Sequence, residues 1–287
     1  MDHRDRKINR MWFLFTGREY NMKSSITDGS QYVELVTHAL HDNFTFKYFK
    51  RHPKYKEVLE HVSYEQGLEY INIAVEQDPE LLNYVNKFSE NDKIGTPMVS
   101  KYSIGKFSPT TLRYIKVLSD LRLLFGPLDD MNIIEIGCGY GGQAKIIMDV
   151  HKVKSYTFID LPPVTKLIRK YMNNFKIETD MNFLSSEDFT EHLLGEYDLV
   201  ISNYAFSECS KEAQDTYISS VLNKSNRGYM VYNFTSHIYG VDSYSKEEIL
   251  NSIKNEILLT EEKPLTHPDN CVIFWGQHDK TKSKNIG

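Results

Sequence analysis

Hydrophobic positions along the chain follow a helical period before residue 131 and alternate between strand-like and helical runs after it. The helical stretches of the first part are YVELVTHAL (32–40), YKEVLEHV (55–62), GLEYINIAVEQ (67–77) and ELLNYVNKF (80–88). Apolar residues there recur every three or four positions, which is typical of amphipathic helices. Because Pro53, Gly67 and Pro79 interrupt the pattern, we expect several short helices rather than one long one.

Residues 89–107 contain two glycines and a proline with little periodicity, and this composition predicts a linking loop. A helix is then expected to begin after Ser108, which is a good N-cap, with Pro109 at its first position. Apolar residues recur every three positions until Gly126 and Pro127 end the run.

From residue 131 onward short apolar strands alternate with amphipathic helices. The expected strands are NIIEI (132–136), SYTFID (155–160), a weaker MNFLS (181–185), DLVISN (198–203), GYMVYN (228–233), NEILLTEE (255–262) and CVIFWG (271–276). The expected helices are QAKIIMDV (143–150), KEAQDTYISSVL (211–222) and KEEILNSI (246–253). The last of these begins with a capping box formed by Ser245 and Glu248.

This alternation predicts an α/β fold with a Rossmann-like, doubly wound, mostly parallel sheet. The short KPLTHPD (263–269) between the final two strands favours a hairpin that adds an antiparallel last strand. We expect residues 1–107 to form a helical N-terminal region that covers or shapes the substrate pocket, residues 108–280 to form the sheet domain, and residues 281–287 to form a flexible tail.

Composition and charge narrow the classes of partner. A net charge of −5 over 287 residues and a pI of about 6.1 provide no basic field for nucleic acid, so we expect no nucleic-acid partner. No apolar run is long enough to cross a bilayer, so we expect no membrane partner. The wide spacing of Cys138, Cys209 and Cys271 argues against structural zinc and against a disulfide framework, and it favours a reducing, cytoplasmic setting. The sequence leaves open whether the protein forms a homo-oligomer.

A glycine-rich turn follows the first strand, in the stretch NIIEIGCGYGGQ (132–143). Gly137, Gly139 and Gly142 satisfy the GxGxxG pattern, and Asp160 stands where an acid that binds ribose is expected. One interpretation is therefore an NAD(P)-dependent oxidoreductase.

Three features favour a different cofactor. Glu135 lies inside the strand and gives Glu-x-Gly-x-Gly-x-Gly, which has the form of motif I in class I S-adenosylmethionine-dependent methyltransferases. The loop comes after some 130 residues, whereas a dinucleotide fold often opens with it. The expected final hairpin is the third feature. We therefore predict S-adenosyl-L-methionine as the cofactor.

The motifs SPTTLRYIKVLSDLRLLFG, IIEIGCGYGGQAKII, YTFIDLPPV, DLVISNYAFSE and GYMVYN together resemble the sugar O-methyltransferase family. The resemblance covers about residues 95–276. It implies methyl transfer from S-adenosylmethionine to a sugar hydroxyl, on a nucleotide sugar or a glycan precursor. A non-sugar small-molecule acceptor is the alternative within the same enzyme class.

Roles for individual residues follow from the loop and from the resemblance. Glu135 is expected to anchor the loop or the amino group of the cofactor, Asp160 to accept both ribose hydroxyls, and Asp188 or Glu187 to reach the adenine amino group. The resemblance implies that Arg113 pairs with the methionine carboxylate. The full set of expected cofactor-binding residues is Arg113, Glu135, Gly137, Cys138, Gly139, Gly141, Gln143, Asp160, Leu161, Asp188, Asn203 and Tyr204.

Plainer interpretations remain for several of these residues. Asp160 before Leu-Pro-Pro also fits a turn that ends a strand, and Cys138 is a small residue suited to filling a tight turn rather than a nucleophile. Arg113 also fits a solvated charge on a helix, with the neighbouring Tyr114 a packing residue.

A sugar hydroxyl needs a general base, which we expect on a loop after a parallel strand. His237 ranks first because of the ordinary pKa of histidine, Glu208 second and His267 third. No spacing of residues demands a metal, so none is expected. For the phosphates of a nucleotide sugar, the nearest basic residues are Lys93, Lys101 and Lys106, which equally fit a solvated loop.

Overall fold

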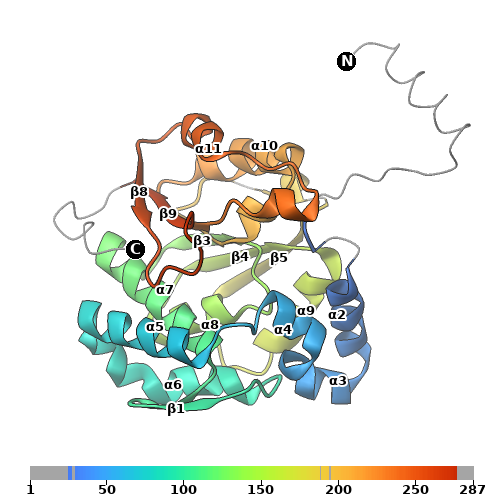
Figure 1. Ribbon diagram of the computed structural model, residues 1–287, viewed down its shortest axis with the longest axis vertical. Coiled ribbons are helices and arrows are strands. Elements are labelled where there is room, and N and C mark those ends of the chain that lie inside the picture. Colours follow the sequence, from blue (N-terminus) through green and yellow to red (C-terminus); the bar gives the residue numbers. More distant parts are fainter. Residues whose placement is uncertain (1–24, 28–29, 188, 194, 277–287) are drawn as a thin grey trace, which may run out of the picture.

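The computed structural model describes residues 25–27, 30–187, 189–193 and 195–276. A seven-stranded sheet with strand order β5-β4-β3-β6-β7-β9-β8 lies at its centre (Figure 1). The strands are β3 (Asn132–Ile136), β4 (Ser155–Asp160), β5 (Asp180–Ser185), β6 (Leu199–Asn203), β7 (Gly228–Tyr232), β8 (Ile257–Glu261) and β9 (Cys271–Trp275). β3 to β7 pair in parallel, while β9 pairs antiparallel with both β7 and β8. The expected doubly wound sheet with an antiparallel last strand is therefore confirmed.

Helices cover both faces of this sheet. The helices are α2 (Gln31–His41), α3 (Asn43–Tyr48), α4 (Pro53–Val58), α5 (Tyr64–Gln77), α6 (Val85–Ser89), α7 (Pro109–Phe125), α8 (Gly142–Val150), α9 (Pro162–Met172), α10 (Lys211–Ser220) and α11 (Lys246–Ser252). Alternate strand residues face two cores: Ile133 packs with α7, α8 and the N-terminal helices, and Ile134 packs with α10 and α11. Figure 1 shows α10 and α11 above the sheet and the N-terminal helices below it.

The structure corrects several sequence expectations for the chain. Gly67 lies inside α5 rather than breaking it. Glycine is needed at this position because the hydroxyl of Tyr102 would stand 2.5 Å from any Cβ there. Residues 89–107 are not one loop, since they contain a 3-10 turn, η3 (Glu90–Lys93), and the hairpin of β1 (Ser100–Tyr102) and β2 (Gly105–Phe107).

Helical structure near prolines also differs from the expectation. The stretch expected as a helix after Pro79 begins as a 3-10 helix, η2 (Pro79–Tyr84). Helix α9 was not foreseen, because the Leu-Pro-Pro that follows Asp160 suggests a turn; here Pro162 occupies the first turn of a helix, where proline is favourable. The remaining 3-10 turns are η1 (Phe49–Arg51), η4 (Phe189–Glu191), η5 (Ala205–Glu208), η6 (Leu222–Lys224) and η7 (Ser236–Tyr239).

The N-terminal helices share their hydrophobic core with the sheet. The ring of Tyr140, in the glycine loop, is fully buried and packs edge-on against Phe49, with 6.1 Å between ring centroids. The ammonium group of Lys50 lies 3.7 Å from the Tyr140 ring centroid and donates to the carbonyl of Asn91 at 2.9 Å. The division of the chain at residue 108 stays a prediction, and the expected tail 281–287 lies outside the described residues.

Within the described residues, no helix has both the length and the apolar character that a membrane crossing requires.

The turn after β3 packs directly against the turn after β6. Gly137 has a φ of +74°, and a Cβ built on it would lie only 1.9 Å from the Cβ of Ala205, the first residue of η5. Position 137 therefore requires glycine for two reasons: its backbone is left-handed, and η5 approaches it too closely for a side chain.

We predict that Gly137→Ala destabilises the protein far more than Gly240→Ala. Gly240 also has a φ of +74°, yet nothing lies within 4 Å of the position of its Cβ. Backbone strain alone costs about 1–2 kcal/mol, whereas overpacking adds about 1–3 kcal/mol. Urea denaturation measures both losses. Adding Ala205→Gly should recover most of the extra loss in the Gly137 variant, and equal losses at the two glycines would contradict the steric argument.

Candidate functional site

Two cavities lie at the carboxyl ends of β3, β4 and β6, where ligands bind in doubly wound sheets. The first, which we call the Tyr217 cavity, has a volume of about 340 Å³ and extends between β4, η4 and α10. The second, the Arg113 cavity, has a volume of about 320 Å³ and extends toward the N-terminal helices. Their walls share Gly137, Asp160, Ala205 and Glu208, together with Thr27. The two cavities therefore meet over the glycine loop.

A short N-terminal segment forms part of this shared wall. Ser25 is bridged antiparallel to Cys209, and the amide of Ile26 donates to the carbonyl of Glu208 at 3.1 Å. Residues 25–27 thus run alongside the end of η5 and bring Thr27 to the cavities.

Asp160 ends β4 with its carboxylate turned onto the glycine loop. One oxygen accepts from the amide of Gly139 at 3.0 Å and the other from the amide of Leu161 at 2.8 Å. Burial raises the pKa of Asp160 to about 7 against the opposing effect of these hydrogen bonds. Each oxygen keeps a second lone pair, so the carboxylate still has capacity to accept hydroxyl donors from a ligand. Asp160 and Leu161 both line the Tyr217 cavity.

Glu135 lies beneath the loop and is absent from the walls of both cavities. Its carboxylate accepts from the hydroxyl of Tyr156 at 2.8 Å, and burial raises its pKa to about 8. The carboxylate thus bonds to a side chain of β4 rather than to the loop, and the anchoring role of Glu135 stays a prediction.

Three other expected loop residues also face inward. Burial raises the pKa of the Cys138 thiol well above its ordinary value, which favours the filler over the nucleophile. The amide of Gly141 donates to the carbonyl of Cys138 at 2.9 Å and closes the turn. The side chain of Gln143 donates to the carbonyl of Tyr114 at 3.1 Å and ties α8 to α7.

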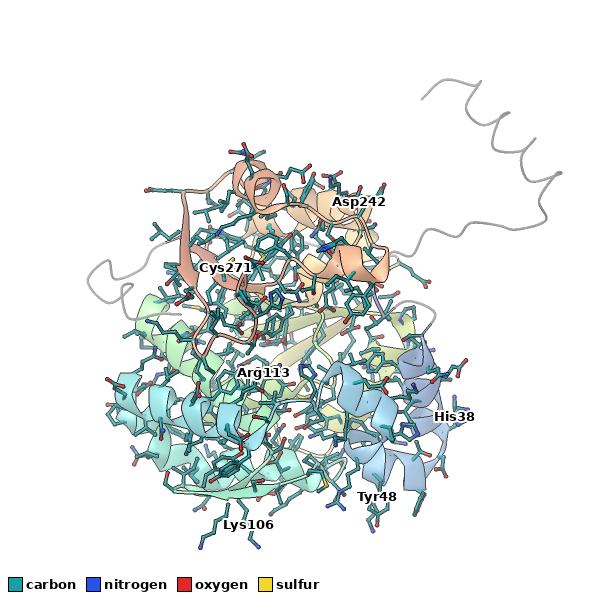
Figure 2. All side chains as sticks on the ribbon, in the orientation of Figure 1. His38, Tyr48, Lys106, Arg113, Asp242 and Cys271 are labelled. Atoms are coloured by element: carbon teal, nitrogen blue, oxygen red, sulfur yellow. The ribbon has the colours of Figure 1, made fainter. Side chains whose placement is uncertain are left out.

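Arg113 is a buried cation directed at the second cavity from α7. The residue is only 7% exposed, and its Nε atom has no hydrogen-bond partner in the described part of the chain. Its guanidinium carbon lies 5.7 Å from the ring centroids of Tyr114 and of Tyr204. No carboxylate of the described residues lies within ion-pair distance of it. Figure 2 shows Arg113 near the middle of the molecule, between the N-terminal helices and the strands.

The end of β6 contributes two more residues to the Arg113 cavity. Both polar atoms of the Asn203 amide are buried and lack a hydrogen-bond partner among the described residues. Tyr204 adopts a φ of +67°, which non-glycine residues rarely do, and its hydroxyl donates to Glu262. A buried cation next to an unpartnered amide is suited to a small anionic group such as a carboxylate.

The three candidate bases do not lie together. Glu208 lines both cavities and accepts from the side-chain amide of Asn233 at 3.1 Å. Burial raises the pKa of Glu208, whereas this hydrogen bond and the charge of Arg113 oppose the rise. His267 is exposed and lines the Arg113 cavity. His237 is exposed and lines a separate cavity of about 680 Å³ beside α11, so the structure does not bring it to the glycine loop.

The sequence analysis expected the N-terminal region to shape the pocket but named none of the residues from it that line the Arg113 cavity. His61, Gln66 and Tyr70 line the Arg113 cavity across from the loop. Burial of its ring and the charge of Arg113 lower the pKa of His61 to about 4, so the imidazole is neutral at pH 7, although the residue as a whole is exposed. No motif surrounds these residues; the only sequence signal is their place in a helical region expected to shape the pocket.

Other expected residues lie away from the site or outside the described chain. Asp188 lies outside the described residues, while its alternative Glu187 lines the Tyr217 cavity. Lys93 pairs with Glu90 at 2.5 Å, and neither it nor Lys101 nor Lys106 lines either cavity. Figure 2 shows Lys106 directed outward at the lower edge of the molecule, away from Arg113. Within the described residues, no group of three or more His, Cys, Asp or Glu side chains is arranged to hold a metal ion.

Sequence comparison does not assign the chain to a family. No family model matches it. A curated protein, the non-reducing polyketide synthase nvfA of Aspergillus novofumigatus (strain IBT 16806), is 30% identical over 102 residues, which are 33% of this chain. The match spans only 4% of that protein's length.

Solved structures similar to the chain include several methyltransferases. PigF with SAH matches with a TM-score of 0.40 and 15% identity, covering 51% of this chain and 50% of PigF. The pyocyanin biosynthetic protein PhzM matches with a TM-score of 0.42 and 11% identity, covering 59% of this chain and 57% of PhzM. Magnesium protoporphyrin IX methyltransferase (ChlM) from Synechocystis PCC 6803 with bound SAH matches with a TM-score of 0.43 and 13% identity, covering 57% of this chain and 81% of ChlM. The chain thus spans half the length of PigF and 57% of that of PhzM. At these TM-scores and identities, the likenesses carry no argument about its activity.

Proposed function

We propose that the protein is an S-adenosylmethionine-dependent O-methyltransferase acting on a sugar hydroxyl. The observation that carries the proposal is the buried guanidinium of Arg113, which lacks a carboxylate partner among the described residues and lines a cavity next to the glycine loop. A buried cation is costly unless it is paired, so a site that keeps one unpaired is suited to a ligand that brings a carboxylate.

The two cavities have the chemistry that the two ends of S-adenosylmethionine need. The amino-acid end would occupy the Arg113 cavity, where Arg113 and the Asn203 amide offer hydrogen bonds to its carboxylate and amino group. The adenosine end would occupy the Tyr217 cavity, with Asp160 at the ribose hydroxyls and Glu187 near the adenine. Gly137, which lines both cavities, lets the ligand cross the loop without meeting a side chain.

Binding of a dinucleotide is the alternative from another enzyme class. The pyrophosphate of a dinucleotide sits at the N-terminus of the helix after the glycine loop. Here Gly142, at the start of α8, is buried, and a Cβ on it would lie 2.5 Å from Tyr114 and 2.7 Å from Tyr140. The third glycine of a dinucleotide-binding loop packs closely in the same way, so titration with NAD(P)H is the measurement that distinguishes the two cofactors.

S-adenosylmethionine supplies an electrophilic methyl group, so the protein has to align an acceptor oxygen, exclude water and remove a proton. Of the three candidate bases, Glu208 is best placed to remove the proton, because it lines both cavities and its carboxylate is positioned by a hydrogen bond from Asn233. Its raised pKa brings its basicity closer to neutral pH. His267 ranks second and His237, beside a different cavity, third.

A sugar as the acceptor is supported by the resemblance of the motifs to sugar O-methyltransferases and by polar groups around the site. A non-sugar small molecule remains the alternative acceptor, and transfer of label from S-adenosylmethionine decides between them. The assay offers methyl glycosides, nucleotide sugars, small phenols, peptides and RNA in separate reactions. Label in phenols or RNA, with none in any sugar, would refute the sugar and leave methyl transfer intact.

We predict that Arg113→Met weakens binding of S-adenosylhomocysteine roughly 10- to 100-fold, the loss of about one charge-assisted hydrogen-bond pair. Calorimetric titration measures the affinity, and a melting curve confirms that the variant is folded. Arg122→Met is the matched control, because Arg122 lies on the same helix and pairs with Asp78 and Glu80 away from the cavities. The wild type should bind S-adenosylhomocysteine and not NAD(P)H; tight binding of NAD(P)H alone would overturn the proposed function.

We predict that Glu208→Gln lowers turnover by about 10²- to 10⁴-fold at saturating S-adenosylmethionine, while the affinity for S-adenosylhomocysteine changes little. The carboxylate is the form that accepts a proton, and burial raises the pKa of Glu208. Turnover should therefore be full above that pKa and fall as the pH drops through it, at a pH above the ordinary range of a glutamate. His237→Gln, at the separate cavity, is the control. A larger loss in the control than in the Glu208 variant would reverse the assignment.

A further inference from the structure

A third cavity, which we call the Tyr239 cavity, opens beside the Arg113 cavity. It has a volume of about 770 Å³ and lies between the start of α2 and helix α4 on one side and η7 on the other. Its wall and that of the Arg113 cavity share Thr27, Tyr32, Val58, His61, Glu208 and Thr235. A molecule in the Tyr239 cavity would therefore reach Glu208.

One hydrogen-bonding group in the Tyr239 cavity lacks a partner among the described residues. The hydroxyl of Ser30 is buried and has no hydrogen-bond partner among the described residues, although Ser30 holds the N-cap position of α2. Gln31 and Thr235 add an amide and a hydroxyl to the same wall. A buried hydroxyl without a partner costs free energy that a hydrogen-bonding ligand would recover.

An aromatic ring stands at the outer wall. Tyr239 is 60% exposed although it is a large hydrophobic residue, and it follows Ile238, which is 68% exposed. Sugars present faces of C–H groups that pack on aromatic rings, while the tyrosine hydroxyl can bond to a ring substituent. An exposed ring beside polar groups is thus suited to a sugar.

The charges of the Tyr239 cavity argue against phosphate. Lys54, the one lysine or arginine of its wall in the described chain, is 3.4 Å from the carboxylate of Glu57, also in the wall. Glu208 adds a carboxyl at the inner end. The pKa of His61 is lowered to about 4 by burial and Arg113, so His61 adds no positive charge at pH 7. Nucleotide sugars carry two phosphates, which need cations that are free to pair with them.

We propose that the Tyr239 cavity is the acceptor site and that the acceptor is a sugar without a phosphate, packed on Tyr239 with one hydroxyl directed at Glu208. This inference rests on the proposed function and narrows it, because it favours a glycan or glycoside over a nucleotide sugar.

The reaction balances with the residues in place. The acceptor oxygen forms a bond to the methyl carbon of the substrate S-adenosylmethionine, while the bond from that carbon to sulfur breaks and its electron pair stays on sulfur. The hydroxyl proton passes to the Glu208 carboxylate, which later releases it to water. No oxidant, reductant or metal ion enters the balance.

The experiment compares methyl β-glycosides of glucose, galactose and N-acetylglucosamine with the UDP conjugates of the same three sugars. With labelled S-adenosylmethionine, the wild type should methylate at least one glycoside with a higher kcat/KM than its UDP conjugate. Tyr239→Ala should raise the KM for that glycoside about tenfold, as expected for loss of a packed ring, while kcat and the affinity for S-adenosylhomocysteine change little. Tyr48→Ala is the matched control, since Tyr48 lies on α3 at the far edge of the molecule (Figure 2).

A second variant tests the charge argument separately. Glu57→Gln frees Lys54 from its ion pair and should shift the ratio of kcat/KM values toward the UDP conjugate. Preference of the wild type for UDP conjugates, or a KM that Tyr239→Ala leaves unchanged, would overturn the inference and leave the proposed function standing. Methylation of neither class, with S-adenosylhomocysteine still bound, would refute the sugar acceptor and this inference together. Failure to bind S-adenosylhomocysteine would instead refute the proposed function itself.

Discussion

The packing of Tyr140 against the N-terminal helices is the interaction on which the rest of the structure depends. Tyr140 belongs to the glycine loop, yet its ring is fully buried among Phe49, Tyr55, Tyr114 and Tyr171. Lys50 stacks its ammonium on this ring, and its pKa is lowered to about 8 by burial. Because Tyr140 belongs to the glycine loop and packs against side chains of the N-terminal region, this contact joins the N-terminal helices to the sheet. The same contact fixes the position of the loop beneath the cavities.

The candidate site contains several buried ionisable groups whose charged forms are disfavoured by burial. Burial raises the pKa values of Glu135, Asp160 and Glu208, while Arg113 has no ion-pair partner in the described chain. Such shifts cluster where a protein binds or transforms a ligand, because a ligand can supply the missing partners. Only Glu135 has its carboxylate engaged by a neighbouring side chain away from the cavities, which fits a supporting role beneath the loop.

The three cavities are joined through shared wall residues. The Tyr217 cavity and the Arg113 cavity meet at Gly137, and the Arg113 and Tyr239 cavities meet at Glu208 and His61. Glu208 lines all three, so it stands where a donor and an acceptor would come together. The described N-terminal segments supply much of the wall of the Arg113 and Tyr239 cavities, so under the proposed function they would shape what enters the site.

The sequence by itself determined the sheet, its antiparallel last strand, the glycine loop and Asp160 at the end of β4, because these follow from local periodicity and turn chemistry. It did not determine the hairpin of β1 and β2, the burial of Gly67 against Tyr102, or the neighbours of Arg113. It also ranked His237 first, although that residue lines another cavity. Only the tertiary structure decided these points, because they depend on contacts between segments tens of residues apart, and no local pattern encodes which side chains such packing brings together.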